Sequence, residues 1–187
     1  ALEIEKDEYY KRLSKVETDI EGLPNIEMFK SEFESYKSLA FEYAEESGLP
    51  VGEFSPALSE ADQKAFPPDH FLFGRDRLFT GGWSGYSHKP HVNRAAHDAL
   101  YHVHIYKPDD KTCYWHDEEK GIEISQWNCR SDAALIYSYI DDLSGNFNFL
   151  ILEIVDPGAH AKYEQAGAIV FWRKKAEAYW VSQGKVR

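Results

Sequence analysis

The sequence predicts an α+β fold in which an antiparallel sheet of about four strands carries N-terminal helices and a C-terminal helix. Apolar residues recur at intervals of three and four near both ends of the chain, which is the spacing of amphipathic helices. In between they alternate with polar residues in four stretches, which is the spacing of strands. With 187 residues, 43% of them hydrophobic and 28% charged, the composition is that of a globular protein and excludes disordered, collagen-like and membrane-spanning classes.

Two helices are expected in the N-terminal third of the chain. Residues 3–20 are rich in charge, have apolar side chains at roughly helical spacing and are followed by glycine and proline. Residues 25–47 show the same spacing more strongly. Four prolines between residues 48 and 72 then predict a loop, with one short turn of helix at 59–65.

The second half of the chain is predicted to form the sheet, after a glycine-rich loop at 80–92. The four candidate strands are residues 98–106, 122–127, 132–140 and 147–155. Because they follow one another with polar turns between them, an antiparallel meander is the simplest topology, and the last and most apolar strand is expected to be central. A closing helix is predicted to run to about Ser182, with Asp156 as N-cap and Pro157 at its first position.

Charge is distributed unevenly along the chain. The formal net charge is −11; residues 1–65 carry sixteen acids against seven bases, and the nearly neutral remainder contains all eight histidines. The acidic segment argues against free-standing nucleic-acid binding by that part of the chain. The first residues lack the apolar core of a signal peptide, so a cytoplasmic location is expected. Cys113 and Cys129 are too few for a disulfide scaffold, although a single bridge stays open.

Several short sequences occur in an order and spacing that resemble one protein family, the YafO toxins. The resemblance extends from about Phe29 to Tyr179. It rests on FESYK at 33–37, FGRD at 73–76, HVHI at 102–105, RSDAALIY at 130–137, FLILEIV at 149–155, and His160 followed by a helix that ends in KAEAY at 175–179.

The resemblance implies a RelE-like fold and cleavage of mRNA on the translating ribosome without a cofactor. It also implies a cognate antitoxin as partner, and no association with a membrane. Relative to that family, the chain has an acidic helical extension at 1–24 ahead of a toxin domain at 25–187, and a proline-rich insertion at about 48–72. Ala134 stands where the family often has a polar residue, commonly His, which weakens a catalytic role for that position.

His102 and His104 are the first candidate catalytic residues. A metal-independent ribonuclease needs a base for the ribose 2′-OH, a cation for the phosphate and an acid for the leaving oxygen, and histidine serves either proton-transfer role near neutral pH. Strand alternation places both histidines on one face and Tyr101, Val103 and Ile105 on the other, which resembles the floor of a site. The alternative is a pair of cross-strand partners on a solvated sheet face.

Asp132 and Arg130 lie where the next strand begins, a position from which polar groups converge above a sheet edge. Asp132 could orient a histidine or act as a catalytic base, and Arg130 could bind a phosphate through two N–H groups. The alternative for Asp132 is a turn residue that bonds the nearby backbone. Tyr137 falls on the opposite face of a regular strand and is expected in the core.

His160 is predicted to lie in the first turn of the closing helix, where free backbone N–H groups favour an anion. With Lys162 nearby, a catalytic histidine beside a phosphate site is expected there; the alternative is a solvated histidine without a role. Arg75 and Asp76 are expected to form a structural ion pair that fixes their loop.

Trp115 is the candidate for stacking on an unpaired base, because it lies in a polar loop, whereas most aromatic residues of a small sheet belong to the core. No metal site is expected, because His88, His91 and His97 lack the fixed spacing of zinc ligands.

The predicted function is therefore that of an endoribonuclease toxin, with two alternatives. One is a non-catalytic binding protein of the same fold, such as a decayed toxin, and the other is an unrelated small histidine-dependent hydrolase. Close, polar His102, His104, Asp132 and His160 would favour the nuclease, whereas burial or dispersal of these groups would favour the alternatives.

The acidic residues 1–22 would repel RNA beside an active face, and so they are expected to dock away from His102 and His160. Leu13, Val16 and Ile20 would supply the apolar stripe for that contact. The alternative is that the segment covers Arg130 and Lys162 and inhibits the toxin.

Overall fold

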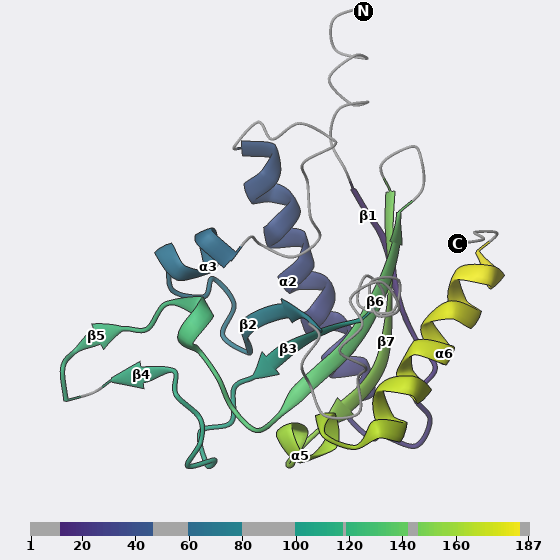
Figure 1. Cartoon of the computed structure of the whole chain (residues 1–187). Helices are drawn as coiled ribbons and strands as arrows, with labels where there is room; N and C mark the ends of the chain where they lie inside the picture. Colours follow the sequence, from purple (N-terminus) through teal and green to yellow (C-terminus); the bar gives the residue numbers. More distant parts are fainter. Residues whose placement is uncertain (1–11, 47–59, 80–99, 118, 142–145, 184–187) are drawn as a thin grey trace, which may run out of the picture.

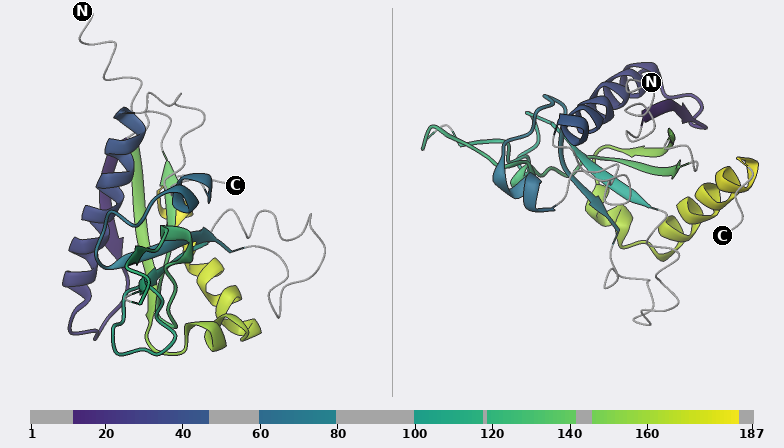
Figure 2. Two further views of the ribbon diagram at one scale, coloured as in Figure 1. Left: turned by 90° about the vertical axis from the view of Figure 1, so that its left-hand side faces the viewer. Right: turned by 90° about the horizontal axis from the view of Figure 1, so that it is seen from above.

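A five-stranded sheet lies between one long helix on one face and two helices on the other, which gives the molecule three layers (Figure 1 and Figure 2). The structure is a computed structural model that describes residues 12–46, 60–79, 100–117, 119–141 and 146–183. The strands, in their order across the sheet, are β1 (Arg12–Thr18), β7 (Asn146–Val155), β6 (Ala134–Asp141), β3 (Tyr101–Ile105) and β2 (Phe73–Leu78). The predicted α+β class is confirmed, and its layout is consistent with a RelE-like fold.

Helix α2 (Ile26–Glu46) covers one face of the sheet, and α6 (Ala166–Ser182) covers the other. Alternation along the strands builds both cores: on β6, Leu135 faces α2, while Ile136 faces α6. The helix expected over residues 25–47 is confirmed as α2, and the short helix expected at 59–65 as α3 (Glu60–Ala65).

Strands β3, β6 and β7 form the expected antiparallel meander. Strand β2 pairs antiparallel with β3, and β1 pairs parallel with β7. The last strand, β7, therefore lies inside the sheet as expected, but β6 holds the middle position because β1 and β2 extend the sheet on both sides.

The helix expected over residues 3–20 is wrong for residues 12–18, which form the strand β1. The reason is a register shift between Leu13 and Lys15, which brings Leu13 and Val16 to the same side of the sheet. A three-residue interval on one face therefore mimics helical spacing. Val16 is buried and Leu13 and Ile20 are partly buried against the α2 core, so this apolar stripe docks as expected, at the sheet edge opposite β2.

The strand expected at 122–127 does not belong to the main sheet. Only β5 (Ile122–Glu123) forms there, paired with β4 (His116–Asp117) in a separate hairpin, and a 3₁₀ turn, η1 (Gln126–Asn128), follows. The sheet uses β2 instead, whose sequence FGRDRL has too much charge to be recognised as a strand. A buried cation, Lys37, explains how the Asp76 side chain of β2 can be accommodated inside the protein.

The closing helix is divided into α5 (Ala159–Tyr163) and α6, and its predicted start is wrong. Gly158, with a φ of 92°, is the residue before α5, and Asp156 and Pro157 precede it. The Asp156 carboxylate instead forms an ion pair with Lys107 at 2.6 Å. The first N–H groups of α5 are satisfied by Asp132, a residue distant in sequence.

Some expectations lie outside the described residues: those for residues 1–11, for the loop at 80–92 with its histidines His88, His91 and His97, and for most of the proline-rich stretch. Cys113 and Cys129 are both free thiols. In the part of the chain that the structure describes, no helix is long and apolar enough to cross a membrane.

Candidate active site

His102 and His104 share the face of β3 that is turned towards α5, with ring centroids 5.7 Å apart. Val103 and Ile105 point into the core beneath α2, as strand alternation predicts. The expected common face is therefore confirmed. Both histidines are nevertheless buried, at 2% and 3% exposure, so they lie beneath the surface of the site and not on a solvated sheet face.

His104 is fixed by the backbone of Ser131. Its Nδ1 lies 2.8 Å from the Ser131 carbonyl oxygen and 3.2 Å from the Ser131 nitrogen, and the shorter contact favours the tautomer in which Nδ1–H donates to the carbonyl. Burial, with His160, Arg75 and Arg130 nearby, lowers the pKa of His104 to about 4 against the effect of the Ser131 bond. Burial also lowers the pKa of His102 well below its ordinary value. Both rings are therefore neutral at neutral pH.

Asp132 and His160 form the exposed part of the site. The Nδ1 of His160 lies 2.8 Å from Oδ1 of Asp132, and the two side chains are 56% and 29% exposed. The same carboxylate accepts hydrogen bonds from the backbone N–H of His160 at 3.0 Å and of Gly158 at 3.1 Å. Asp132 thus caps α5 and orients the imidazole of His160.

The protonation of Asp132 follows from these contacts. Burial by itself would raise the pKa of Asp132, but hydrogen bonds from the backbone N–H and ring of His160 and from Gly158 outweigh it, so the pKa is lowered. An ionised carboxylate favours a proton on Nδ1 of His160, which leaves Nε2 as the atom that can exchange protons with a substrate. The ring of His104 lies beside that of His160, with centroids 5.9 Å apart.

Three arginines surround the histidines. Arg77 is directly opposite His102 in the β2–β3 register, Arg75 is half-buried beside it, and Arg130 is exposed. Burial, Arg130 and Arg77 lower the pKa of Arg75 to about 10, which shows that these cations lie close together. Arg75 and Arg77 were not predicted as site residues, although the alternation of charge in FGRDRL could have indicated them.

The expected ion pair between Arg75 and Asp76 is wrong. Asp76 points to the other face of β2, where its carboxylate binds the Lys37 ammonium at 2.6 Å, with both side chains fully buried. Tyr36 and Tyr137 donate hydrogen bonds to the same carboxylate at 2.9 and 2.7 Å, and Tyr137 is a core residue as expected. Burial lowers the pKa of Lys37 against the opposing effect of Asp76.

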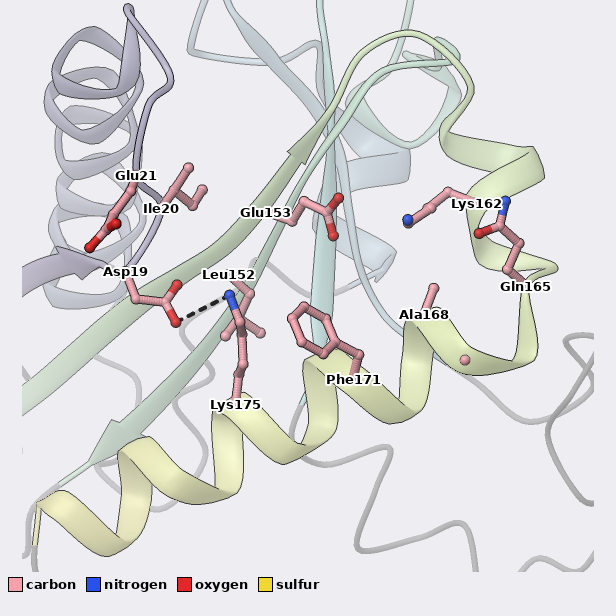
Figure 3. A pocket seen from close by; sticks show the side chains of 11 residues that line it. Asp19, Ile20, Glu21, Leu152, Glu153, Lys162, Gln165, Ala168, Phe171 and Lys175 are labelled. Carbon is pink, nitrogen blue, oxygen red and sulfur yellow. Dashed lines mark ion pairs between the residues drawn. The ribbon is translucent and has the colours of Figure 1, made fainter.

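Lys162 and Trp115 lie apart from His160. Lys162 points into a hollow of about 580 Å³ between the end of β1, β7 and α6, whose lining residues include neither His160 nor Asp132 (Figure 3). Trp115 is 5% exposed and packs against Gly74, so the expectation that its ring is open for base stacking is wrong. Within the described residues, no group of three or more His, Cys, Asp or Glu side chains is arranged to hold a metal ion.

The comparison with protein families identifies the chain at this point. A family model described as toxin YafO, type II toxin-antitoxin system, matches residues 60–181. The chain belongs to the YafO toxin family. Comparison with curated proteins finds no match, and neither does comparison with solved structures.

The YafO match covers both the buried histidines of β3 and the exposed pair of Asp132 and His160, and it leaves out β1 and α2. The similarity expected at residues 33–37 therefore lies outside the matched part, although Lys37 in that stretch binds Asp76 inside it. As a member of this family, the chain is a toxin of a type II toxin-antitoxin system, and an antitoxin is its partner.

Proposed function

We propose that this YafO-family toxin is an endoribonuclease that cleaves mRNA on the translating ribosome, in the cytoplasm, by metal-independent proton transfer. The observation that carries the proposal is the exposed His160, held by Asp132 at 2.8 Å and placed beside a buried, neutral His104. A carboxylate-oriented imidazole among arginines has the groups that cleavage of a phosphodiester needs.

The proposed reaction is attack of a ribose 2′-oxygen on the adjacent phosphorus. Nε2 of His160 takes the 2′-OH proton, the oxygen–phosphorus bond forms, and the bond to the 5′-oxygen breaks; the 5′-oxygen takes a proton from water. A 2′,3′-cyclic phosphate and a 5′-OH result. Asp132 stabilises the imidazolium that forms, and Arg130 stabilises the extra negative charge on the phosphate.

His104 supports this chemistry through its lack of charge. A positive charge 5.9 Å from His160, measured between ring centroids, would oppose the formation of an imidazolium. With a pKa of about 4, His104 stays neutral, and so does His102 beneath it. The catalytic roles expected for His102 and His104 stay predictions, and their burial favours support of His160 over direct contact with RNA.

Dependence on the ribosome fits the charge of the protein. A net charge of −11 opposes binding to free RNA, whose affinity for proteins comes largely from phosphate contacts. On the ribosome, the mRNA is already held in place, and the toxin needs only local cations at the site. The same argument supports mRNA and the ribosome as partners besides the antitoxin.

A non-catalytic toxin of the same fold is the second candidate, which the burial of His102 and His104 favours. Ala134 lies directly opposite His104 in the register of β3 and β6 and is fully buried, so this face lacks a polar group where the family often has one. The hydrolase alternative loses its support, because the chain belongs to a toxin family.

Inducible expression with mapping of mRNA 5′ ends separates these candidates. We expect growth arrest and new mRNA ends in translating extracts, and none in extracts in which translation is blocked. Equal cleavage of naked RNA would contradict the ribosome requirement. The absence of new ends in both extracts would favour the non-catalytic toxin.

A further inference from the structure

Three cationic side chains lie around the Trp127 ring at the outer edge of the sheet. Its ring centroid lies 4.5 Å from Cζ of Arg75, 5.5 Å from Nζ of Lys64 and 5.8 Å from Cζ of Arg77. These distances are within the range of cation–π attraction. The four residues, which we call the Trp127 cluster, come from η1, β2 and α3 and form a local positive surface on a protein with a net charge of −11.

Arg75 is held in the Trp127 cluster by two contacts with the same residue. Its Nε donates to the backbone carbonyl of Trp127 while its guanidinium lies over the ring of the same residue. No carboxylate of the described residues forms an ion pair with it, and the nearby Glu60 is already paired with Lys64 at 2.5 Å. Among the described residues, Arg75 therefore presents a fixed guanidinium that is not ion-paired with a carboxylate.

Two buried glutamines fasten β2 on either side of Arg75. Gln63 of α3 both donates to the carbonyl oxygen of Asp76 and accepts from its N–H, each at 2.9 Å. Gln126 of η1 donates to the carbonyl oxygen of Gly74 and to the Tyr36 hydroxyl, each at 3.1 Å. These side chains bond the outer edge of β2 as a further strand would, which fixes the backbone from which Arg75 projects.

We propose that Arg75 binds a phosphate of the RNA strand next to the bond that His160 attacks, and that Gln63 and Gln126 are its positioning residues. The proposal rests on the proposed function, because it takes RNA as the ligand. A planar guanidinium fixed on an aromatic ring binds a phosphate through two N–H groups and loses little side-chain entropy on binding. Arg77, two residues from Arg75 along β2, is directly opposite His102 in the register of β2 and β3. Arg75 also lowers the pKa of both His102 and His104, so the subsite lies on the part of the sheet that carries the histidines.

The test measures binding of a short single-stranded RNA whose 2′-oxygens are methylated and which therefore cannot be cleaved. The RNA carries a fluorophore, and its anisotropy is followed with the purified full-length protein between about 50 and 200 mM salt. We expect Arg75→Gln to weaken binding about tenfold and to reduce the slope of log K against log salt by about 1. Arg75→Lys should keep the slope and still lose affinity, because an ammonium lacks the fork of N–H groups.

Gln63→Leu tests positioning. It keeps the charge of Arg75 and removes both bonds to Asp76, so affinity should fall while the salt slope stays that of the wild type. Lys174→Gln is the matched control, because it removes one exposed cation from α6, which packs mainly on β7 and β6. Its affinity and slope should equal those of the wild type, and thermal melts confirm that each variant is folded.

The possible outcomes separate the subsite from the nuclease. Wild-type affinity and slope in Arg75→Gln overturn the subsite. If the folded wild type binds no free RNA even at the lowest salt, as its net charge of −11 allows, mRNA cleavage in translating extracts decides, and wild-type cleavage by Arg75→Gln overturns the subsite. Wild-type affinity in folded Gln63→Leu overturns the positioning role; if that variant does not fold, the two Arg75 variants still decide the subsite. Binding that depends on Arg75 in a protein that cuts no mRNA supports the subsite and overturns the nuclease.

Discussion

Asp132 serves two purposes, because one carboxylate caps α5 and orients His160. Substitution of Asp132 would therefore change both stability and activity, so a substitution of His160 is the better test of activity. We expect His160→Asn to lower mRNA cleavage in translating extracts by about a hundredfold or more, the range for loss of a proton-transfer group. Because its side chain is 56% exposed, the melting temperature should hardly change. As the control, His116→Asn at an exposed histidine of β4 should leave cleavage unchanged. If His160→Asn lowers the melting temperature as well as the activity, His160 has a structural role instead.

The buried histidines make stability depend on pH. Folded His104 has a pKa of about 4, whereas an unfolded histidine titrates near 6.5, so the unfolded chain binds more protons between these values. The free energy of unfolding should therefore be highest above about pH 6.5 and fall as the pH drops towards 4, by up to about 1.4 kcal/mol per pH unit for each such histidine. Urea unfolding between these pH values measures the slope. His104→Gln should make the slope shallower, and an unchanged slope would contradict the neutral state of His104.

At the scale of the elements, β2 is tightly packed at Gly74. A Cβ built there would lie 2.4 Å from the Trp115 ring and 2.5 Å from the Cys129 carbonyl oxygen. Gly74→Ala should therefore cost about 1–3 kcal/mol through overpacking. Gly167→Ala on α6 is the matched control, because its Cβ would meet nothing within 4 Å and should stabilise the helix by about 0.5–1 kcal/mol. Denaturant unfolding compares the two, and equal effects would contradict the close contact at β2.

The buried ion pair joins α2 to β2. Lys37→Met leaves the Asp76 carboxylate without its cation inside the protein, and we expect a loss of about 3–5 kcal/mol in the free energy of unfolding. The double variant Lys37→Met with Asp76→Asn removes both charges and should recover part of that loss. Denaturant unfolding of the single and double variants forms the measurement. A single variant as stable as the wild type would contradict a stabilising role for the buried ion pair.

The sequence predicted those elements whose apolar pattern is undisturbed by tertiary contacts. Helix α2 buries one regular face, whereas strands β3, β6 and β7 send alternate side chains to the two faces of the sheet, so the spacing of each element is regular. Strands β1 and β2 were missed because a register shift in one and a buried ion pair in the other hide the period of two. Their placement depends on residues far away in the chain, such as Lys37, which no local pattern contains.

The sequence predicted which residues form the candidate site better than it predicted how they are arranged in space. The common face of His102 and His104 follows from alternation alone. The bond between Asp132 and His160 joins residues 28 apart and depends on how α5 approaches β6. Lys162, two residues beyond His160 on a short helix, points elsewhere for the same reason: neighbours in sequence diverge around a helix axis.

For the whole molecule, β1 makes the N-terminal segment part of the fold. Deleting residues 1–22 removes β1, exposes the edge of β7 and should lower the melting temperature and promote association through that edge. Deleting residues 1–11 keeps β1 and is the matched control, whose melting temperature should stay close to that of the full chain. Thermal melts with size-exclusion chromatography compare the two. A stable monomer after deletion of residues 1–22 would contradict the structural role of β1.

The pairing of β1 with β7 also sets the order in which the protein can be completed while it is being made. Thr18 of β1 bonds Ile151 of β7, which is synthesised 133 residues later. His160 follows β7 in turn, so a chain whose synthesis has not yet reached β7 has neither a closed sheet nor its exposed histidine. A premature stop codon before β7 therefore yields a fragment that lacks both the partner strand of β1 and the proposed catalytic histidine.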